Sequence, residues 1–315
     1  MFFKNKKIKI KKLYPNLKIN KDFIIQGVKP LQRAKESDLT FFDSAKYKSE
    51  ANTTKAKVCI TTSKLQEYLS NKTKKVIVKN VLYELSKILS QIYPGAEIDI
   101  PDTSLTKPKK TKYKNVKFGN NVLVGRNVKI GKGTIIGSNT IIEHDVIIGK
   151  NCVFGHSVIL KNSLIGDNVI IQDNNKIGQK GFGFIPLQDK NIKFPHIGMV
   201  KINDNVEIAS GCTIDRGSID DTVIGENTYL DNQVHVAHNV KIGKNCMIAG
   251  QVGFAGSSNI GNNVSIGGQA GISGHLKIGS NVKIGGGSGV VKDIEDNQVV
   301  MGYPATNLKD FLKKK

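Results

Sequence analysis

The chain is dominated by a hydrophobic pattern with a period of six residues. Residues 222–293 divide without a gap into twelve six-residue units, from TVIGEN, TYLDNQ and VHVAHN to SGVVKD. The third place of every unit is aliphatic or Phe, the first is usually small or β-branched, and the fourth is most often Gly. A short fixed period of this kind indicates a solenoid. We therefore predict a β-solenoid with three strand and three turn residues per unit, the third side chain pointing inward and the second outward.

The same period extends the predicted solenoid over residues 116–300. It runs from Val116 to Lys180 except at VILKN, which is one residue short, and it resumes after residue 199. The interruption, GFGFIPLQDKNIKFPHIGM, covers residues 181–199 and is predicted to be an inserted loop. Loops inserted into a regular scaffold often carry function.

The segments on either side of the repeats have other patterns. Residues 1–100 predict a small α/β domain. Its β-like runs are Phe23–Gly27, Val58–Thr61 and Val76–Val78, and its helical candidates are Thr62–Ser70 and Leu82–Ile92. Residues 101–115, rich in Pro and Lys, indicate a linker. In the C-terminal extension, residues 301–315, the sequence MGYPA should stop the strands before a short basic helix.

Composition narrows the possible partners and the compartment. The formal charge is +21 and the pI about 9.7, but much of the lysine lies in the first 115 residues and in the turns. Because zinc-finger spacing and RNA-binding aromatic motifs are missing, we expect no nucleic-acid role and an acidic protein partner instead. Neither a signal-peptide run nor 18 continuous apolar residues occur, which predicts a cytoplasmic protein without a transmembrane segment. Cys152, Cys212 and Cys246 fall on inward first places and should be buried in a reducing compartment.

The period converts the sequence into a surface map. Three units complete one coil, so residues 18 apart lie above one another at about one strand spacing, ~4.8 Å. On one face the outward places read His235, Gly253, Gly271 and Gly289, and the turn places above His238 read Gly256, Gly274 and Lys292. Gly weakens a strand because it loses more conformational entropy and packs no side chain. The stacked glycines therefore indicate a groove that begins at His238 and holds an extended chain.

His238 is the candidate catalytic residue at the start of this groove. Asp231, Asn232 and Asn239 are expected in the same turns, where their carboxylate and amide groups would fix the tautomer and orientation of its ring. His275, two coils above and offset by one place, is expected roughly 10 Å away and facing the same groove.

The remaining histidines raise a metal site as an alternative. His235 and His238 share one coil, but His275 lies too far up to complete a site with ligand distances near ~2 Å. We expect no metal and no bound cofactor, and a zinc site shared between subunits is the alternative. His196 lies in the inserted loop, from which it could reach a neighbouring subunit, and it is a candidate substrate-binding residue.

A cluster of aromatic residues marks the N-terminal domain. Residues 38–47, DLTFFDSAKY, hold three aromatics and a Lys. Such side chains either form core or provide a platform that stacks a flat base. The pattern alone leaves both interpretations open.

Taken together, these segments resemble a known family. IIQGVKPLQRAKESDLTFF, KYKSE, VIVKN, GQKGFGF, TIDRGSIDDTVIGENTYLDNQVHVAHNVKIG and SGHLKIG are similar to the UDP-3-O-acylglucosamine N-acyltransferases of lipid A synthesis. The repeats resemble the left-handed parallel β-helix of hexapeptide-repeat acyltransferases. The resemblance covers roughly residues 23–305. It departs from the family at Ser44, where an Asn is usual, and in Lys4 to Lys18, where no opening helix is apparent.

The resemblance implies a homotrimer that transfers a 3-hydroxyacyl chain from acyl carrier protein to the 2-amino group of UDP-3-O-acylglucosamine. It places the catalytic base on His238, the second motif histidine on His275, and polar helpers on Asp231, Asn232 and Asn239. Phe41 and Tyr47, with Ser44 between them, match the uracil-binding segment of the N-terminal domain. A 3-hydroxyacyl thioester of the acidic carrier protein would be the co-substrate.

The map and the resemblance lead to one mechanistic hypothesis. His238 would take a proton from the sugar amine as it attacks the thioester carbonyl, and a backbone N–H of Gly256 would face the oxyanion. Gly274 and the other stacked glycines would hold the acyl chain or pantetheine arm, and Lys292 would contact the carrier protein. The alternatives are the related O-acyltransferase acting on UDP-N-acetylglucosamine, which starts directly with repeats, and a non-catalytic trimeric scaffold that binds a sugar nucleotide.

Overall fold

The computed structural model describes residues 2–109 and 111–313, which form two compact units. The first contains residues 3–100 and 183–197, and the second contains Phe2, residues 101–182 and the chain from Gly198 onward. Each is described below by itself. None of the helices within the described ranges combines the length and apolar character that crossing a bilayer requires.

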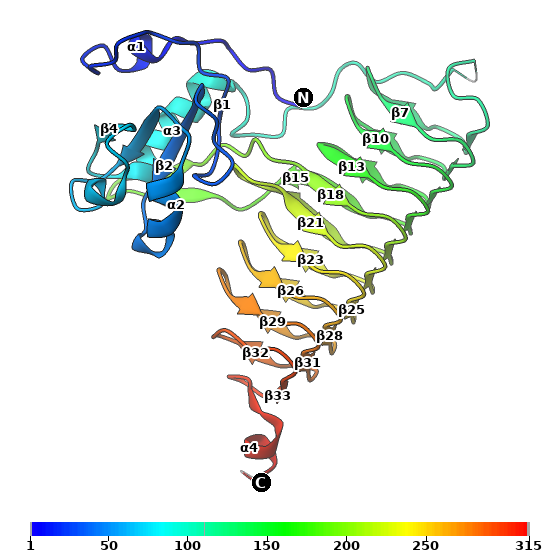
Figure 1. Ribbon diagram of the computed structural model, residues 1–315. Coiled ribbons are helices and arrows are strands. Elements are labelled where there is room, and N and C mark those ends of the chain that lie inside the picture. Colours follow the sequence, from blue (N-terminus) through cyan, green and yellow to red (C-terminus); the bar gives the residue numbers. More distant parts are fainter. Residues whose placement is uncertain (1, 110, 314–315) are drawn as a thin grey trace. The chain divides into compact units, whose positions relative to one another are not determined.

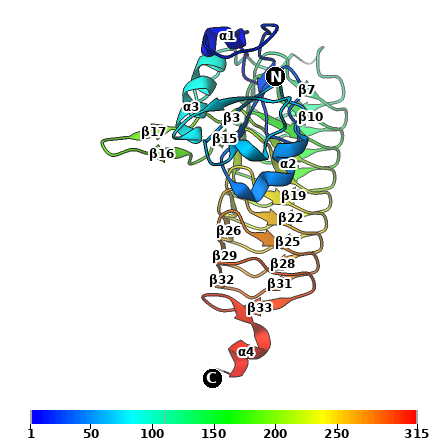
Figure 2. The same cartoon turned by 60° about the vertical axis from the view of Figure 1, so that its left-hand side comes forward.

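The second unit is the predicted parallel β-helix (Figures 1 and 2). Each short strand pairs in parallel with the strand one coil further on, and in the unbroken block this partner lies 18 residues away. His235 pairs with Gly253, Gly253 with Gly271, and Gly271 with Gly289. The short unit VILKN shortens its coil by one residue, so that Ile159 pairs with Lys176. The 18-residue map is confirmed.

Three sheets form the three faces of the solenoid. The histidine face consists of β6 (Leu123–Val124), β9 (Ile141–Ile142), β12 (Ile159–Leu160), β15 (Lys176–Lys180), β20 (Thr213–Arg216), β23 (His235–Val236), β26 (Gly253–Phe254), β29 (Gly271–Ile272) and β32 (Gly289–Val290).

The apolar face consists of β5 (Lys117–Phe118), β8 (Ile135–Ile136), β11 (Val153–Phe154), β14 (Ile170–Ile171), β19 (Glu207–Ile208), β22 (Tyr229–Leu230), β25 (Met247–Ile248), β28 (Ser265–Ile266), β31 (Lys283–Ile284), β33 (Val299–Met301) and antiparallel β34 (Thr306–Asn307).

The lysine face consists of β7 (Lys129–Ile130), β10 (Ile147–Ile148), β13 (Ser163–Ile165), β18 (Val200–Ile202), β21 (Thr222–Ile224), β24 (Lys241–Ile242), β27 (Asn259–Ile260) and β30 (Lys277–Ile278).

Inward side chains at the first and third places fill the interior. Val234 and Val236 are fully buried on either side of His235, which points outward and is exposed. Cys152, Cys212 and Cys246 are buried free thiols, as their first-place positions predict. Burial raises the pKa of Cys212 to about 11, so its thiol stays protonated at neutral pH.

The sixth place of most units turns the corner between two faces. The residues there have positive φ, for example +56° at Asn227, +64° at Asn239 and +61° at His275. Asn tolerates this left-handed conformation better than most residues, which explains its frequency at that place. At one corner the Asn side chains also bond to each other from coil to coil, with Asn245 Nδ2 donating to Asn263 Oδ1 at 3.2 Å.

The first unit contains a four-stranded parallel sheet, in the order β1 (Gly27–Val28), β2 (Asp38–Phe42), β3 (Val58–Thr61), β4 (Lys74–Ile77). Its helices and turns are α1 (Ile10–Leu13), η1 (Ala45–Tyr47), α2 (Lys48–Thr53), η2 (Gln66–Tyr68) and α3 (Val81–Ile92). The amphipathic helix α3 contacts β2 and β3, and Asn80 caps it by accepting a hydrogen bond from the Tyr83 N–H. The α/β class is confirmed, but β2 and α2 were not predicted.

Two local predictions in this unit need correction. The helix expected at Thr62–Ser70 is only the 3-10 turn η2, and the strand expected at Phe23–Gly27 is reduced to β1. The opening helix that the sequence did not reveal is the single turn α1, whose Ile10 is fully buried.

The inserted segment is not an open loop. It forms a hairpin of β16 (Phe184–Pro186) and β17 (Asn191–Lys193), and residues 183–197 belong to the first unit. His196 is fully buried there, its backbone N–H donating to Ala96 O at 3.0 Å and its ring lying against Phe194 and Gly183. The prediction that His196 reaches a neighbouring subunit is therefore wrong, because its own chain encloses it.

The ends of the solenoid are covered by short segments. Within the segment expected to be a linker, residues 101–109 and 111–115 contain groups that pack on the first coils. Asp102 Oδ2 accepts the His144 N–H at 2.8 Å, Thr106 forms an antiparallel bridge with Val124, and Tyr113 is buried in the solenoid core. At the other end the turn after β33 leads to the short helix α4 (Leu308–Lys313), as predicted.

Candidate active site

A groove of about 770 Å³ runs along the histidine face. It begins at His235 and His238 and continues over the stacked glycines of β26, β29 and β32. Its lining is Phe182, His235, Ala237, His238, Gly253, Phe254, Ala255, Gly256, Gln269, Gly271, Ile272, Ser273, Gly287, Ser288, Gly289, Val290, Val291 and Tyr303. The glycine column predicted from the repeat therefore lies in a real groove.

Asn239 fixes the orientation of the His238 ring. His238 Nδ1 lies 3.0 Å from Asn239 Oδ1. The same oxygen accepts hydrogen bonds from the Ser218 N–H at 3.0 Å and the Ser218 hydroxyl at 2.7 Å, while Asn239 Nδ2 donates to Asp220 O. A backbone N–H can only donate, so Oδ1 is an acceptor and His238 Nδ1 must carry the hydrogen. The neutral ring then presents the Nε2 lone pair, which is the form that a general base requires.

Gly256 provides the surface on which the His238 ring rests. A Cβ built on Gly256 would lie 2.7 Å from His238 Cε1 and 2.8 Å from Nε2, too close for any other residue without moving the ring. Gly274 stacks above in turn, since a Cβ there would lie 3.1 Å from Gly256 O. The vertical order that the sequence predicts for these three residues is confirmed.

Sequence reasoning missed the interactions of His235. Its Nδ1 lies 2.7 Å from Thr213 Oγ1, and its Nε2 lies 4.0 Å from Asp215 Oδ2. Asp215 is buried and accepts a hydrogen bond from Gln179 at 3.0 Å. The partner Thr213 is 22 residues from His235 because the four-residue joint SIDD lengthens this coil. This four-residue insertion is visible in the sequence, and the pairing of Thr213 with His235 could have been predicted from it.

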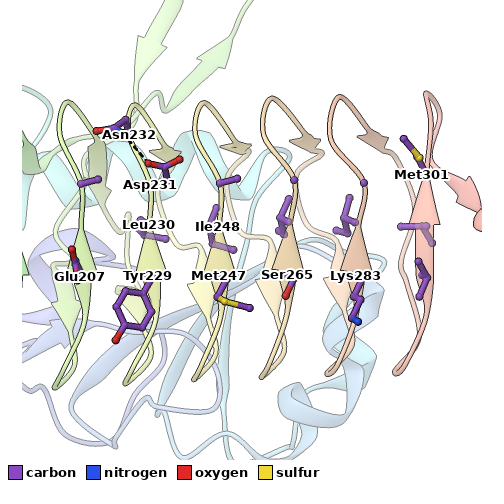
Figure 3. A pocket seen from close by; sticks show the side chains of 18 of the residues that line it. Glu207, Tyr229, Leu230, Asp231, Asn232, Met247, Ile248, Ser265, Lys283 and Met301 are labelled. Carbon is purple, nitrogen blue, oxygen red and sulfur yellow. Dashed lines mark hydrogen bonds between the residues drawn. The ribbon is translucent and has the colours of Figure 1, made fainter.

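Asp231 and Asn232 do not lie at His238 within this chain, contrary to the prediction that they share its turns. Each six-residue unit turns one corner of the solenoid. Asn232 and His238 hold the same place in two consecutive units, so they lie at two different corners. At its corner, Asn232 Nδ2 donates to Asp231 Oδ1 at 2.8 Å (Figure 3). Asn232 Oδ1 accepts a hydrogen bond from the Ser210 N–H. Both line a groove on the apolar face instead.

This second groove has a volume of about 1,030 Å³. Glu207, Tyr229, Met247, Ser265 and Lys283 follow one another along its outer strands, one per coil (Figure 3). Tyr229 is 50% exposed and Met247 60% exposed, which is high for side chains of their size and polarity. Together with Ile135, Val153 and Ile170 on earlier coils of the same face, these exposed apolar side chains are typical of an interaction surface.

Two further predicted site residues lie near the first groove without lining it. His275, at a corner place with positive φ, is exposed, and its N–H donates to Gly256 O at 3.1 Å. Its ring is not among the groove-lining side chains, so the expectation that it faces the groove does not hold in the single chain. Lys292 is exposed in the turn beyond Val291.

The predicted uracil-binding segment lies at the end of β2 and the start of α2. Phe41 is partly exposed and Tyr47 is 39% exposed, whereas Phe42 is fully buried against Tyr68. Ser44 Oγ accepts the Lys46 N–H and so caps the short turn that carries Tyr47. Of the adjacent pair, Phe42 is core and Phe41 is the residue with an available face.

The described residues contain no group of three or more His, Cys, Asp or Glu side chains placed to hold a metal ion. His235 and His238 line the groove, whereas His275 does not. A zinc site within one chain thus has no complete ligand set in the part of the chain that the structure describes.

Comparison with known proteins is consistent with this geometry. Residues 22–90 match the profile of the family described as UDP-3-O-(3-hydroxymyristoyl) glucosamine N-acyltransferase, LpxD, and residues 221–256 match the bacterial transferase hexapeptide repeats. The chain is 58% identical over 67 residues to the UDP-3-O-acylglucosamine N-acyltransferase of Rhizobium rhizogenes, a match that spans 21% of this chain and only 19% of that relative.

A longer match covers most of the chain. UDP-3-O-acylglucosamine N-acyltransferase 2 of Nitrobacter winogradskyi is 40% identical over 232 residues, which cover 71% of this chain and 68% of the relative. Among solved structures, a UDP-N-acetylglucosamine acyltransferase from Campylobacter jejuni is similar with a TM-score of 0.53 and 22% identity, over 61% of this chain and 73% of that one. The structural likeness supports the fold alone.

Proposed function

Because the chain belongs to the UDP-3-O-acylglucosamine N-acyltransferase family, as its 40% identity over 68% of the Nitrobacter relative shows, we propose that it catalyses this acyl transfer. The acceptor would be the 2-amino group of UDP-3-O-acylglucosamine, and the donor a 3-hydroxyacyl thioester of acyl carrier protein. The observation that carries the proposal is the tautomer of His238, whose Nε2 lone pair is presented at the start of the groove.

The proposed reaction forms one C–N bond and breaks one C–S bond. The neutral sugar amine attacks the thioester carbonyl, and His238 Nε2 takes the proton that the amine loses. The C–S bond then breaks, and the pantetheine sulfur leaves as a thiolate that takes this proton from the imidazolium. The imidazolium that forms keeps its Nδ1–H bond to Asn239 Oδ1, an oxygen held in place by Ser218. A backbone N–H of Gly256 would face the oxyanion, in the manner of other preorganised donors.

A homotrimer would account for the apolar face. Its exposed column consists of Ile135, Val153, Ile170, Tyr229, Met247 and Val299. Packing this face of one copy against the histidine face of the next would bury the column and bring Asp231 and Asn232 to the His238 of the neighbour. In this arrangement both residues keep the helper role that they lack within one chain.

The remaining substrate contacts follow from the exposed groups. Phe41 and Tyr47 would stack the uracil ring, with Ser44 fixing the turn between them. Gly274 and His275 would border the acyl chain where subunits meet. Lys292 would contact the acidic carrier protein in the cytoplasm, where both substrates are available.

The decisive test is the His238→Ala variant, assayed with 3-hydroxyacyl carrier protein and UDP-3-O-acylglucosamine. Loss of a general base is expected to lower kcat by about 10²–10⁴-fold. His144→Ala is the matched control, because that ring pairs with Asp145 at a corner of the early coils, outside the groove. Retention of most turnover in His238→Ala would contradict the assignment.

The same assay separates the alternatives. Acylation of UDP-N-acetylglucosamine in place of the 3-O-acyl acceptor would identify the O-acyltransferase reaction. Binding of the sugar nucleotide with no transfer from any donor would favour a scaffold.

A further inference from the structure

The first unit carries a row of lysines near the start of the chain. Residues 7–11 alternate between Lys and Ile, as Lys7, Ile8, Lys9, Ile10 and Lys11. The two isoleucines are 8% and 0% exposed, whereas the three lysines are exposed. One buried and one solvated side is what a half-buried extended segment shows. The buried isoleucines therefore direct the lysines into solvent.

The backbone of this row is paired with residues 23–25. Ile10 N donates to Phe23 O at 2.9 Å, and Ile25 N donates to Ile8 O at 2.9 Å. The lysines thus extend from a hydrogen-bonded scaffold.

An exposed apolar side chain lies among these lysines. Lys9 forms an antiparallel bridge with Ile24, and residues directly opposite in such a pair have their side chains on the same side. Ile24 is 38% exposed, whereas its neighbour Ile25 is fully buried. The solvated side of the ribbon therefore combines positive charge with one apolar group.

The positive charge of this region is not neutralised by neighbouring acids. Residues 2–26 contain one acidic residue, Asp22, whose Oδ1 accepts the backbone N–H groups of Lys11 and Phe23. No lysine side chain of residues 2–26 forms an ion pair within the described ranges. Such a concentration of one sign of charge attracts an anionic partner. The exposed lysines are Lys4, Lys6, Lys7, Lys9, Lys11, Lys12, Lys18 and Lys21.

We propose that these eight lysines and Ile24, named here the lysine patch, bind the surface of an anionic lipid bilayer. Clusters of about four to eight basic residues are typical of segments that bind anionic lipids. A bilayer surface offers anionic head groups to the lysines and an apolar layer to Ile24. A nucleic acid backbone offers a partner for the charge alone, so the exposed isoleucine favours the bilayer.

Binding to a bilayer also suits the proposed acyl transfer. The product of that reaction carries two acyl chains on a sugar nucleotide, and two chains hold a molecule stably in a membrane. An enzyme at the bilayer surface releases this product where its chains are buried. This link rests on the proposed function, whereas the binding itself does not.

The experiment measures cosedimentation of the full chain with vesicles of phosphatidylglycerol and phosphatidylcholine in equal parts, and with vesicles of phosphatidylcholine alone. Only the mixed vesicles should bind, and less so at high salt, which screens the charges. The triple variant Lys7→Gln, Lys9→Gln, Lys11→Gln should bind about 100-fold more weakly, since each lysine near an anionic surface contributes about fivefold.

The matched control removes the same charge from the solenoid. Lys129, Lys132 and Lys277 are exposed there, and their replacement by Gln should leave vesicle binding within about threefold of wild type. An equal loss in the two triple variants would overturn the inference, as would wild-type protein that ignores the mixed vesicles.

A second variant distinguishes a bilayer from a soluble polyanion. Ile24→Thr keeps a β-branched side chain in the ribbon, and unchanged urea midpoints would show that it and the lysine variant fold. It should weaken vesicle binding about three- to sevenfold, the share of a buried isoleucine that its exposed fraction represents. Binding of an RNA oligonucleotide without vesicle binding would identify a nucleic-acid surface and overturn the inference.

Acyl transfer between soluble substrates provides a separate readout. The lysine and Ile24 variants should keep wild-type turnover, because none of the substituted residues lies in the proposed site. Vesicle binding by a wild-type protein that acylates no acceptor would overturn the proposed function and leave the lysine patch supported, so the two failures are distinguishable.

Discussion

Substituting Gly256 by Ala tests whether the placement of the His238 ring matters for turnover. The added Cβ would lie 2.7 Å from His238 Cε1, whereas ordinary contact begins at 3.4 Å, so the ring or the backbone must move by 3.4 − 2.7 = 0.7 Å. The φ of Gly256 is not in the left-handed region, so Ala is compatible with the backbone there. The perturbation is therefore a displacement of the proposed base and not a local unfolding.

The magnitude follows from this displacement. A misplacement of about 1 Å in a catalytic group costs on the order of 10²-fold in rate, so kcat should fall by ten- to a hundredfold with little change in KM. Stability should change little. Replacing Gly gains about 0.5–1 kcal/mol, and a weakened bond between His238 Nδ1 and Asn239 Oδ1 loses about 1 kcal/mol.

The assay compares kcat, KM and the urea midpoint of Gly256→Ala with those of Gly253→Ala. Gly253 lies in the same six-residue unit, but its added methyl meets nothing within 4 Å. Crowding of the groove by that methyl should raise KM, whereas displacement of the base lowers kcat. If Gly256→Ala kept kcat within threefold of wild type while remaining folded, the ring position would not be critical and the argument from its contact with Gly256 would fail.

Two further changes probe charge. Asn239→Asp keeps an acceptor for Ser218 but places a carboxylate beside His238, which favours the imidazolium. The acidic limb of the kcat/KM profile against pH should therefore move to higher pH. A limb that does not move would argue against His238 as the base. Burial alone would raise the pKa of Asp102, but hydrogen bonds from Ser104 and the His144 N–H outweigh it and lower that pKa. A lowered folded-state pKa gives stability that is present above the unfolded value near ~3.9 and is lost as pH falls through the folded value. Urea unfolding should therefore show Asp102→Asn less stable than wild type at pH 6, with the difference shrinking as pH falls below ~3.9. A difference in stability that does not change with pH would contradict this role.

The periodic part of the molecule was predictable because one rule repeats. A unit of six with an inward third place determines the coil, and the coil determines that Gly253 lies over His235 and Gly256 over His238. The error over Asp231 and Asn232 came from the same rule. The period determines how far along the solenoid axis a residue lies. Neighbouring units lie on different faces, however, so residues that are close in sequence are not always close in space.

The non-periodic parts were less predictable, because their contacts join distant segments. Nothing local in FPHIGM shows that His196 packs against Ala96, and nothing in MGYPA shows that Tyr303 lies over Gly289. The strand β2 was hard to predict because its aromatic residues also fit a platform that stacks a base. Phe42 points into the core and Phe41 away from it, as period two requires.

The 18-residue register also determines how this architecture can change in length. Removing six residues anywhere in the solenoid would rotate every later unit onto the next face, scattering the glycines from their column. Removing or duplicating 18 residues between the coils of His238 and Gly289 would leave each face intact and move the closing turn by one step, ~4.8 Å. The length of the groove available to a ligand can therefore change only in steps of one coil. Within a step, the side chain that fills the last coil of the groove determines the remaining space.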